Sequence, residues 1–104
     1  MKLVRDKIPE IIEEDGKWCL CRKTKTQDEH LNFLKEKIVE EVDELIFDPS
    51  YEEAADVLEV LISFCFLYDL DFEKVILAAK NKREKNGGFQ KGIVLVRVGK
   101  DENE

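Results

Sequence analysis

The chain has 104 residues, of which 43% are hydrophobic and 39% are charged. This length suits a single domain, and this balance is typical of a globular protein rather than a disordered one. The formal net charge of −7 argues against a broad nucleic-acid-binding surface, because such surfaces are strongly basic. We therefore predict one domain over residues 1–104, without a nucleic-acid partner.

The cysteines and the hydropathy of the chain indicate the cellular compartment of the protein. The 3 cysteines, Cys19, Cys21 and Cys65, lack the spacing of a disulfide framework or a zinc site and suit a reducing environment. Charges begin at Lys2, which argues against a secretory signal. The most apolar stretch, Val57 to Tyr68, is too short to cross a bilayer. These features predict a cytoplasmic protein without a membrane partner.

The first half of the chain predicts two helices and a strand. A short helix is expected around Pro9, which fits a first helical turn, and it stops at Gly16. Residues 17–23 favour a short strand by composition. Thr26 and Glu29 then have the form of a capping box that opens a longer amphipathic helix. The apolar positions of that helix recur at three- and four-residue steps: Leu31, Leu34, Ile38, Val42 and Leu45.

The third predicted helix is the most apolar segment. Asp48-Pro49-Ser50 predicts a turn, with Ser50 as the N-cap. From Val57 onward nearly every side of the helix is apolar, and such a helix must be buried all round. A chain of this length has too few other elements to cover it, so we predict that a second subunit does.

The last third predicts one more helix and one more strand. Asp71 is expected to cap the helix, which ends at Gly87-Gly88. Residues 92–98, GIVLVRV, read as a β-branched strand that pairs with residues 18–21 in a two-stranded ribbon lying against the helices. The predicted fold is therefore all-α, an oligomeric four-helix-bundle-type subunit with a small β-ribbon.

Two pairs of carboxylates stand out on the second and third helices. Glu41 and Glu44 form an E-x-x-E pair, and Glu53 and Asp56 form an E-x-x-D pair. A three-residue step keeps both members of a pair on one helix face. Two antiparallel helices can aim these oxygens at one point, where a hard cation such as Mg²⁺ would neutralise them.

Each of these acids also has an ordinary structural interpretation. Glu53 stands three residues after Ser50 and can complete a capping box. Glu41 can pair with Lys37 one turn earlier, and Glu44 can lie on a solvated face. The metal site and the structural interpretation both stay open at this stage.

A basic cluster at the end of the fourth helix is the second candidate component. Lys82 and Arg83 lie there, followed by Gly87-Gly88-Phe89. Cations favour a helix C-terminus through the helix dipole, which explains them without a ligand. Beside a metal site they would instead bind phosphate, with the glycines allowing a close backbone approach.

The combined motifs resemble a known superfamily. Residues 40–44, EEVDE, followed by residues 53–56, EAAD, resemble the EExxE…ExxD signature of the all-α nucleoside triphosphate pyrophosphohydrolases, which include MazG-like proteins, dimeric dUTPases and phosphoribosyl-ATP pyrophosphohydrolases. Residues 2–9, KLVRDKIP, and residues 82–89, KREKNGGF, are similar to the small stand-alone phosphoribosyl-ATP pyrophosphohydrolase-like proteins. The resemblance covers nearly the whole chain.

The resemblance implies a Mg²⁺-dependent enzyme, with Mn²⁺ as a substitute, that splits a nucleoside triphosphate between its α and β phosphates. It also implies a helical homodimer or dimer of dimers. By matching position, the implied metal ligands are Glu41, Glu44, Glu53 and Asp56. The implied phosphate contacts are Lys82, Arg83, Arg5 and Lys7. Glu41 or Glu40 would accept the proton of the attacking water.

The expected role is disposal of unwanted nucleotides. The alternatives are hydrolysis of phosphoribosyl-ATP in histidine biosynthesis, a non-catalytic metal- or nucleotide-binding helical dimer, and a purely structural dimer. Only eight residues separate Glu44 from Glu53, fewer than in many relatives, so base-recognition elements found there in relatives have little room. A base can stack on Trp18 or Phe89, although such aromatics are more often part of a core.

Overall fold

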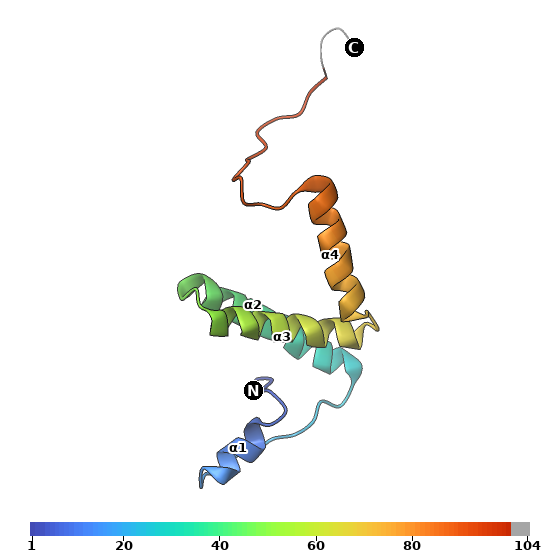
Figure 1. The fold of residues 1–104 in the computed structure, drawn as a ribbon. Helices are drawn as coiled ribbons and strands as arrows, with labels where there is room; N and C mark the ends of the chain where they lie inside the picture. The colour runs from blue at the N-terminus through green and yellow to red at the C-terminus, as the bar shows by residue number, and fades with distance from the viewer. Residues whose placement is uncertain (101–104) are drawn as a thin grey trace. The chain divides into compact units, whose positions relative to one another are not determined.

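Four helices make up the regular structure of residues 1–100, the part of the chain that this computed structural model describes (Figure 1). Their bounds are Ile8–Glu14 for α1, Gln27–Phe47 for α2, Tyr51–Leu67 for α3 and Phe72–Asn86 for α4. The predicted all-helical class is confirmed. The chain divides into two compact units, Met1–Phe72 and Glu73 onward, and each is described by itself.

The short helix α1 has the ends that the sequence predicts. Pro9 lies in its first turn, where its missing N–H costs no hydrogen bond. After the helix, Gly16 has a φ of +79°, and its N–H donates to the Glu13 carbonyl at 3.0 Å. A glycine reaches this left-handed conformation without the steric cost that a side chain brings.

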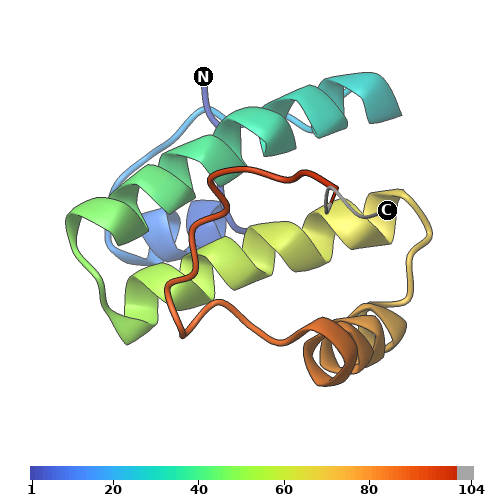
Figure 2. The same ribbon diagram turned by 90° about the horizontal axis from the view of Figure 1, so that it is seen from above.

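Helices α2 and α3 begin at the predicted N-caps and form an antiparallel hairpin (Figure 2). The Thr26 hydroxyl accepts a hydrogen bond from the Glu29 N–H at 3.1 Å, and the Ser50 hydroxyl accepts one from the Glu53 N–H at 3.1 Å. Only residues 48–50 connect the two helices. Because the connection is this short, α3 folds back directly onto α2 and brings the two acidic segments together.

The hydrophobic core of the hairpin is small. Its buried apolar side chains are Leu31, Leu34, Val60 and Cys65. On α3, by contrast, Leu58 is 47% exposed and Phe66 is 78% exposed. The all-round burial that the sequence predicts for α3 is therefore not reached in the isolated chain. No helix of the described residues is long and apolar enough to cross a membrane.

The predicted β-ribbon is not formed in the described part of the chain. Residues 17–23 and residues 92–98 contain neither helix nor strand. The apolar side chains of the second segment are all exposed, from 76% at Leu95 to 89% at Val96. A strand needs a hydrogen-bonded neighbour and a covered face, and composition alone supplies neither.

The second unit consists mainly of α4 and the residues that follow it. The helix begins directly after Asp71 and ends at Asn86, close to the predicted bounds. Gly87 follows with a φ of +85°, and its N–H donates to the Arg83 carbonyl at 2.8 Å. The predicted glycine stop of this helix is thus confirmed. Residues 101–104 lie outside the described residues.

Candidate metal centre

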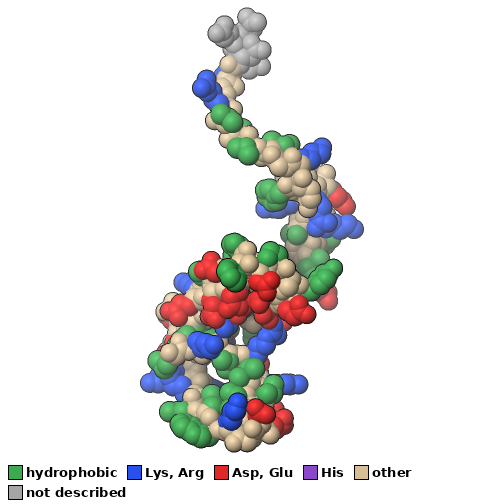
Figure 3. All heavy atoms as spheres, turned by 90° about the vertical axis from the view of Figure 1, so that its left-hand side faces the viewer, with side chains coloured by type: hydrophobic (Ala, Val, Ile, Leu, Met, Phe, Trp, Pro, Cys, Tyr) green, Lys and Arg blue, Asp and Glu red, His purple; other side chains and the backbone are tan. Residues whose placement is uncertain are grey.

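Three of the four predicted carboxylates converge between the helices of the hairpin. Glu41 comes from α2, and Glu53 and Asp56 come from α3; one oxygen from each lies within 4.8 Å of the other two. Ligand oxygens about 2.1 Å from Mg²⁺ lie roughly 3–4 Å apart, so a small closure brings this group to coordinating distance. Acidic side chains form a band across the hairpin in Figure 3.

Glu41 is the most buried member of the group, with only 7% of its surface exposed. One of its carboxylate oxygens, Oε1, lies 3.3 Å from the Lys37 Nζ. The other oxygen, Oε2, is buried and has no hydrogen-bond partner among the described residues. A buried carboxylate oxygen without a partner is costly, and a bound cation would satisfy it.

Glu53 shows that the capping-box interpretation is only half correct. Its backbone N–H donates to Ser50, as a capping box requires. Its carboxylate does not return the hydrogen bond to the start of the helix, and its Oε2 is buried without a partner among the described residues. The side chain of Glu53 therefore contributes to the carboxylate group instead of to the helix cap.

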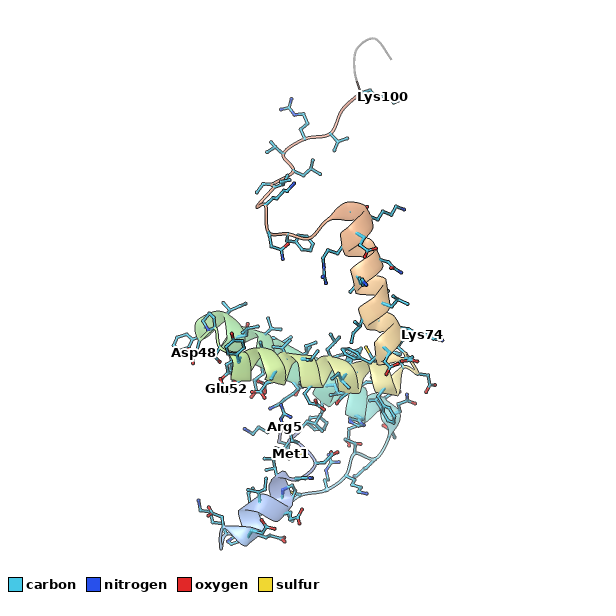
Figure 4. All side chains as sticks on the ribbon, in the orientation of Figure 1. Met1, Arg5, Asp48, Glu52, Lys74 and Lys100 are labelled. Atoms are coloured by element: carbon cyan, nitrogen blue, oxygen red, sulfur yellow. The ribbon has the colours of Figure 1, made fainter. Side chains whose placement is uncertain are left out.

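Asp56 is held by a cation from a distant part of the sequence. The Arg5 Nη2 lies 2.7 Å from the Asp56 Oδ1, across 51 residues of chain. Figure 4 shows Arg5 below α3, reaching up from the N-terminal segment. The two side chains are 56% and 37% exposed, and an exposed pair of this kind contributes about 0.2–1 kcal/mol to stability.

Lys37 is a site residue that the sequence prediction did not include. Its side chain is only 18% exposed, and its Nζ lies 3.4 Å from the Glu40 Oε1 as well as 3.3 Å from the Glu41 Oε1. A lysine three and four residues before two glutamates on one helix was the available signal. The structural interpretation of Glu41, pairing with Lys37, is confirmed, but that pairing uses only one of the two Glu41 oxygens.

The remaining predicted acids lie outside the convergent group. Glu44 is exposed and is not among the three convergent carboxylates, so its role as a fourth ligand stays a prediction. Glu40 is partly exposed and pairs with Lys37. Neither Glu40 nor Glu44 lines the cavity beside the three convergent carboxylates, whereas Glu41 does.

The predicted phosphate contacts fall into two sets. Arg5 and Lys7 line the cavity beside the carboxylates. Lys82 and Arg83 are exposed residues of the second unit, so their contact with phosphate stays a prediction. Among the aromatic candidates for base stacking, Trp18 is 86% exposed and Phe89 is 97% exposed, which shows that neither is a core residue.

A cavity of about 470 Å³ adjoins the carboxylates within the first unit. One part of its wall is charged and carries Arg5, Asp6, Lys7, Lys37, Glu41, Asp56 and Glu59. Another part is largely apolar and carries Leu3, Val4, Ile8, Ile11, Leu34 and Val60, with His30 and Ser63 as polar neighbours. This volume suits a small-molecule ligand, and the mixed lining suits one with an anionic end and an apolar or aromatic end.

Comparisons with known proteins identify no relative. No protein-family model matches the chain, and no curated protein and no solved structure matches it. Membership of the superfamily that the motifs resemble therefore stays a prediction, and the centre is interpreted from its own residues.

Proposed function

We propose that this chain is a Mg²⁺-dependent nucleoside triphosphate pyrophosphohydrolase that releases a nucleoside monophosphate and pyrophosphate. One observation carries the proposal: two buried carboxylate oxygens, one on Glu41 and one on Glu53, have no partner among the described residues and belong to one convergent group. An all-oxygen donor set of this kind suits Mg²⁺ or Mn²⁺. The adjoining cavity has room for a nucleotide.

The cations beside the group support a polyanionic substrate. Arg5 and Lys37 both line the cavity, and in a chain of net charge −7 such local cations are what a triphosphate needs in order to approach. We propose that these two residues and Lys7 bind phosphate oxygens. Lys82 and Arg83 are proposed as further contacts from the end of α4, where the helix also favours cations.

The residues suggest a division of roles. Glu41, Glu53 and Asp56 would hold the metal, with Glu44 as the proposed fourth ligand. When bound, Mg²⁺ neutralises phosphate charge and helps to orient the attacking water. Glu41 is favoured over Glu40 as the acceptor of the water proton, because only Glu41 lines the cavity. The fold keeps Glu41 oriented through its ion pair with Lys37.

Pyrophosphate release tests the proposal. The purified chain should release pyrophosphate from at least one member of a panel of canonical, deoxy and damaged triphosphates and phosphoribosyl-ATP, in the presence of Mg²⁺ but not of a chelator. Asp56→Asn should reduce this rate about a hundredfold or more, since even residues that only support a metal ligand affect activity roughly ten- to a hundredfold.

Asp43→Asn is the matched control. Asp43 is an exposed acid on the same acidic stretch of α2, and it is not one of the three convergent carboxylates. It should keep its activity, and both variants should keep the helical circular dichroism signal. An Asp56→Asn protein as active as the unmodified chain would refute the proposed centre. Metal binding without hydrolysis of any panel member would instead favour a non-catalytic binding module.

We also propose that the active form is at least a homodimer. Apolar side chains remain exposed along the hairpin, including Val39 and Ile46 on α2 and Leu58 and Phe66 on α3. A second copy that covers them would complete a helical bundle, and residues 18–21 and 92–98 are proposed to pair as a ribbon in that assembly. Light scattering at micromolar concentration would contradict this proposal if it returned 12.1 kDa, the mass of one chain.

A further inference from the structure

The N-terminal segment, residues 1–7, is joined to the metal centre by one polar contact. Among the described residues, the Arg5–Asp56 ion pair is the one hydrogen bond or salt bridge that connects this segment to the α2–α3 hairpin. Residues 3–6 of the segment also line two cavities, of about 470 and 930 Å³. Leu3 and Val4 are half-buried, whereas Met1, Lys2 and residues 5–7 are exposed, so the ion pair is the polar link that fixes the exposed part of the segment to the hairpin.

A divalent cation would compete with a resident cation for the same carboxylate. Lys37 lies beside Glu40 and Glu41, whereas Arg5 holds one oxygen of Asp56, a member of the convergent group. A divalent cation bound to Asp56 would stand within a few ångströms of the Arg5 guanidinium, and like charges at such distances repel strongly where water is partly excluded.

Arg5 is the cation that can leave. Lys37 lies on the same helix as Glu41, is only 18% exposed and contacts two glutamates. Arg5 is 56% exposed and belongs to a segment that no helix holds before Ile8. An exposed ion pair on such a segment exchanges at small cost.

We propose that Arg5 is the resident counter-ion of Asp56, and that a divalent cation displaces it from this carboxylate. This inference rests on the metal centre of the proposed function and adds its regulation. The buried, unpartnered Oε2 of Glu41 is the independent sign that the acidic group takes a ligand. The displaced guanidinium stays at the wall of the cavity, beside the metal, where it can bind an oxyanion of the substrate. Metal binding thereby converts Arg5 from an internal counter-ion into a phosphate contact.

A different geometry makes the opposite prediction. If Arg5 stayed on the Asp56 Oδ1 while the metal used the other oxygen, the guanidinium would orient the ligand and support metal binding. Removal of Arg5 would then weaken metal affinity. Under displacement, removal of Arg5 strengthens metal affinity, because the metal no longer competes with a resident cation. The sign of the change separates the two geometries.

Titration calorimetry with Mn²⁺ alone and with Mg²⁺ alone measures that sign. Arg5→Gln should bind the metal about 1.4- to fivefold more tightly than the unmodified chain, the range that an exposed ion pair corresponds to. Lys2→Gln is the matched control, because it removes the same charge from the same segment, and Lys2 makes no ion pair in the described structure. Its metal affinity should stay within experimental error of the unmodified chain.

Proteolysis gives a second, independent measurement. Trypsin must take the Arg5 side chain into its own specificity pocket, so cleavage after Arg5 requires that the guanidinium leave Asp56. Mn²⁺ should therefore speed cleavage after Arg5 relative to cleavage after Lys23, an exposed lysine outside this segment that serves as the internal reference for the protease. Mass spectrometry of the released peptides reports both rates in one experiment.

The outcomes separate this inference from the proposed function. Equal or weaker metal binding by Arg5→Gln, or an unchanged ratio of the two cleavages, would overturn the displacement and leave the metal centre standing. If neither protein binds Mn²⁺ or Mg²⁺, the metal centre itself is wrong, and the displacement falls with it. Tighter binding by Arg5→Gln together with faster cleavage after Arg5 would establish both.

Discussion

The N-termini of α2 and α3 carry the same motif and use it differently. Thr26 and Glu29 open α2, and Ser50 and Glu53 open α3. In both, the hydroxyl of the first residue accepts a hydrogen bond from the N–H of the glutamate three positions later, at 3.1 Å. The backbone halves of the two caps are therefore equivalent.

The two glutamate side chains differ completely. The Glu29 Oε1 accepts hydrogen bonds from the Lys25 N–H at 3.0 Å and from the Arg22 Nη1 at 2.8 Å. The Arg22 guanidinium also reaches the second oxygen, at 3.2 Å. The Glu53 Oε2, in contrast, is buried without a partner among the described residues.

The residue before each N-cap explains part of the difference. Before Thr26 stands Lys25, whose N–H is the donor that Glu29 uses. The matching position before Ser50 is Pro49, and proline has no N–H to offer. No cation matches Arg22 either, because the residue four positions before Ser50 is Ile46. A glutamate that the helix cap does not satisfy is available to a metal.

The largest expected effects, on activity and on the melting temperature, come from replacing Glu53 and Glu29 one at a time. Glu53→Gln should reduce Mg²⁺-dependent pyrophosphate release about a hundredfold or more, because it removes a metal ligand. In the presence of a chelator its melting temperature should stay equal or rise, since one charge of a crowded acidic group is gone. Glu29→Gln should do the reverse, with nearly normal turnover and a lower melting temperature. Equal behaviour of the two variants would show that the two motifs are not functionally distinct.

A smaller effect is expected from supplying the missing donor. Pro49→Ala places an N–H where α2 has the N–H of Lys25, so Glu53 gains a competing partner at the helix end. One hydrogen bond of this kind corresponds to about 0.5–1.5 kcal/mol, or roughly a two- to twelvefold loss of Mg²⁺ affinity by calorimetry. Lys25→Pro is the mirror variant: it removes the donor at Glu29 and should leave Mg²⁺ affinity unchanged. An unaltered Mg²⁺ affinity in Pro49→Ala would show that the proline does not release Glu53.

The helix ends could be predicted from sequence because short-range chemistry sets them. Hydroxyl caps at Thr26 and Ser50, the glycine stops and the three-residue turn all act within a few residues of the structure they determine. The same holds for Glu41, Glu53 and Asp56: helical spacing puts them on suitable faces, and the short turn brings the faces together.

Long-range contacts were the part that sequence could not supply. The Arg5–Asp56 ion pair joins residues 51 positions apart, and no local pattern indicates which carboxylate a distant arginine will meet. The predicted ribbon is not formed in the described chain for the same reason, since residues 92–98 have the composition of a strand but no neighbouring strand. Glu44 was assigned from its helical spacing and from the resemblance; its side chain is exposed and outside the convergent group, so its role as a fourth ligand stays a prediction.

The smallest expected effect is a pH dependence of the stability, which arises from Glu29 at the start of α2 and has no counterpart at the start of α3. The hydrogen bonds from Arg22 and from the Lys25 N–H lower the pKa of Glu29 from 4.5 to about 2. A carboxylate with a lowered pKa contributes stability that is fully present above pH 4.5 and is lost as the pH falls toward about 2. Because the Glu29 side chain is 29% exposed, solvent weakens the pair and the loss should be modest.

Melting curves between pH 5 and pH 2 test this dependence. The melting temperature of the unmodified chain should fall more steeply over this range than that of Glu29→Gln, which has no carboxylate to protonate at this position. The melting temperature of Glu53→Gln should fall as steeply with pH as that of the unmodified chain, because the Arg22–Glu29 pair at the start of α2 is intact in this variant. Parallel curves for the unmodified chain and Glu29→Gln would show that the Arg22 pair does not stabilise the fold, and the contrast between the two glutamates would then rest on Glu53 alone.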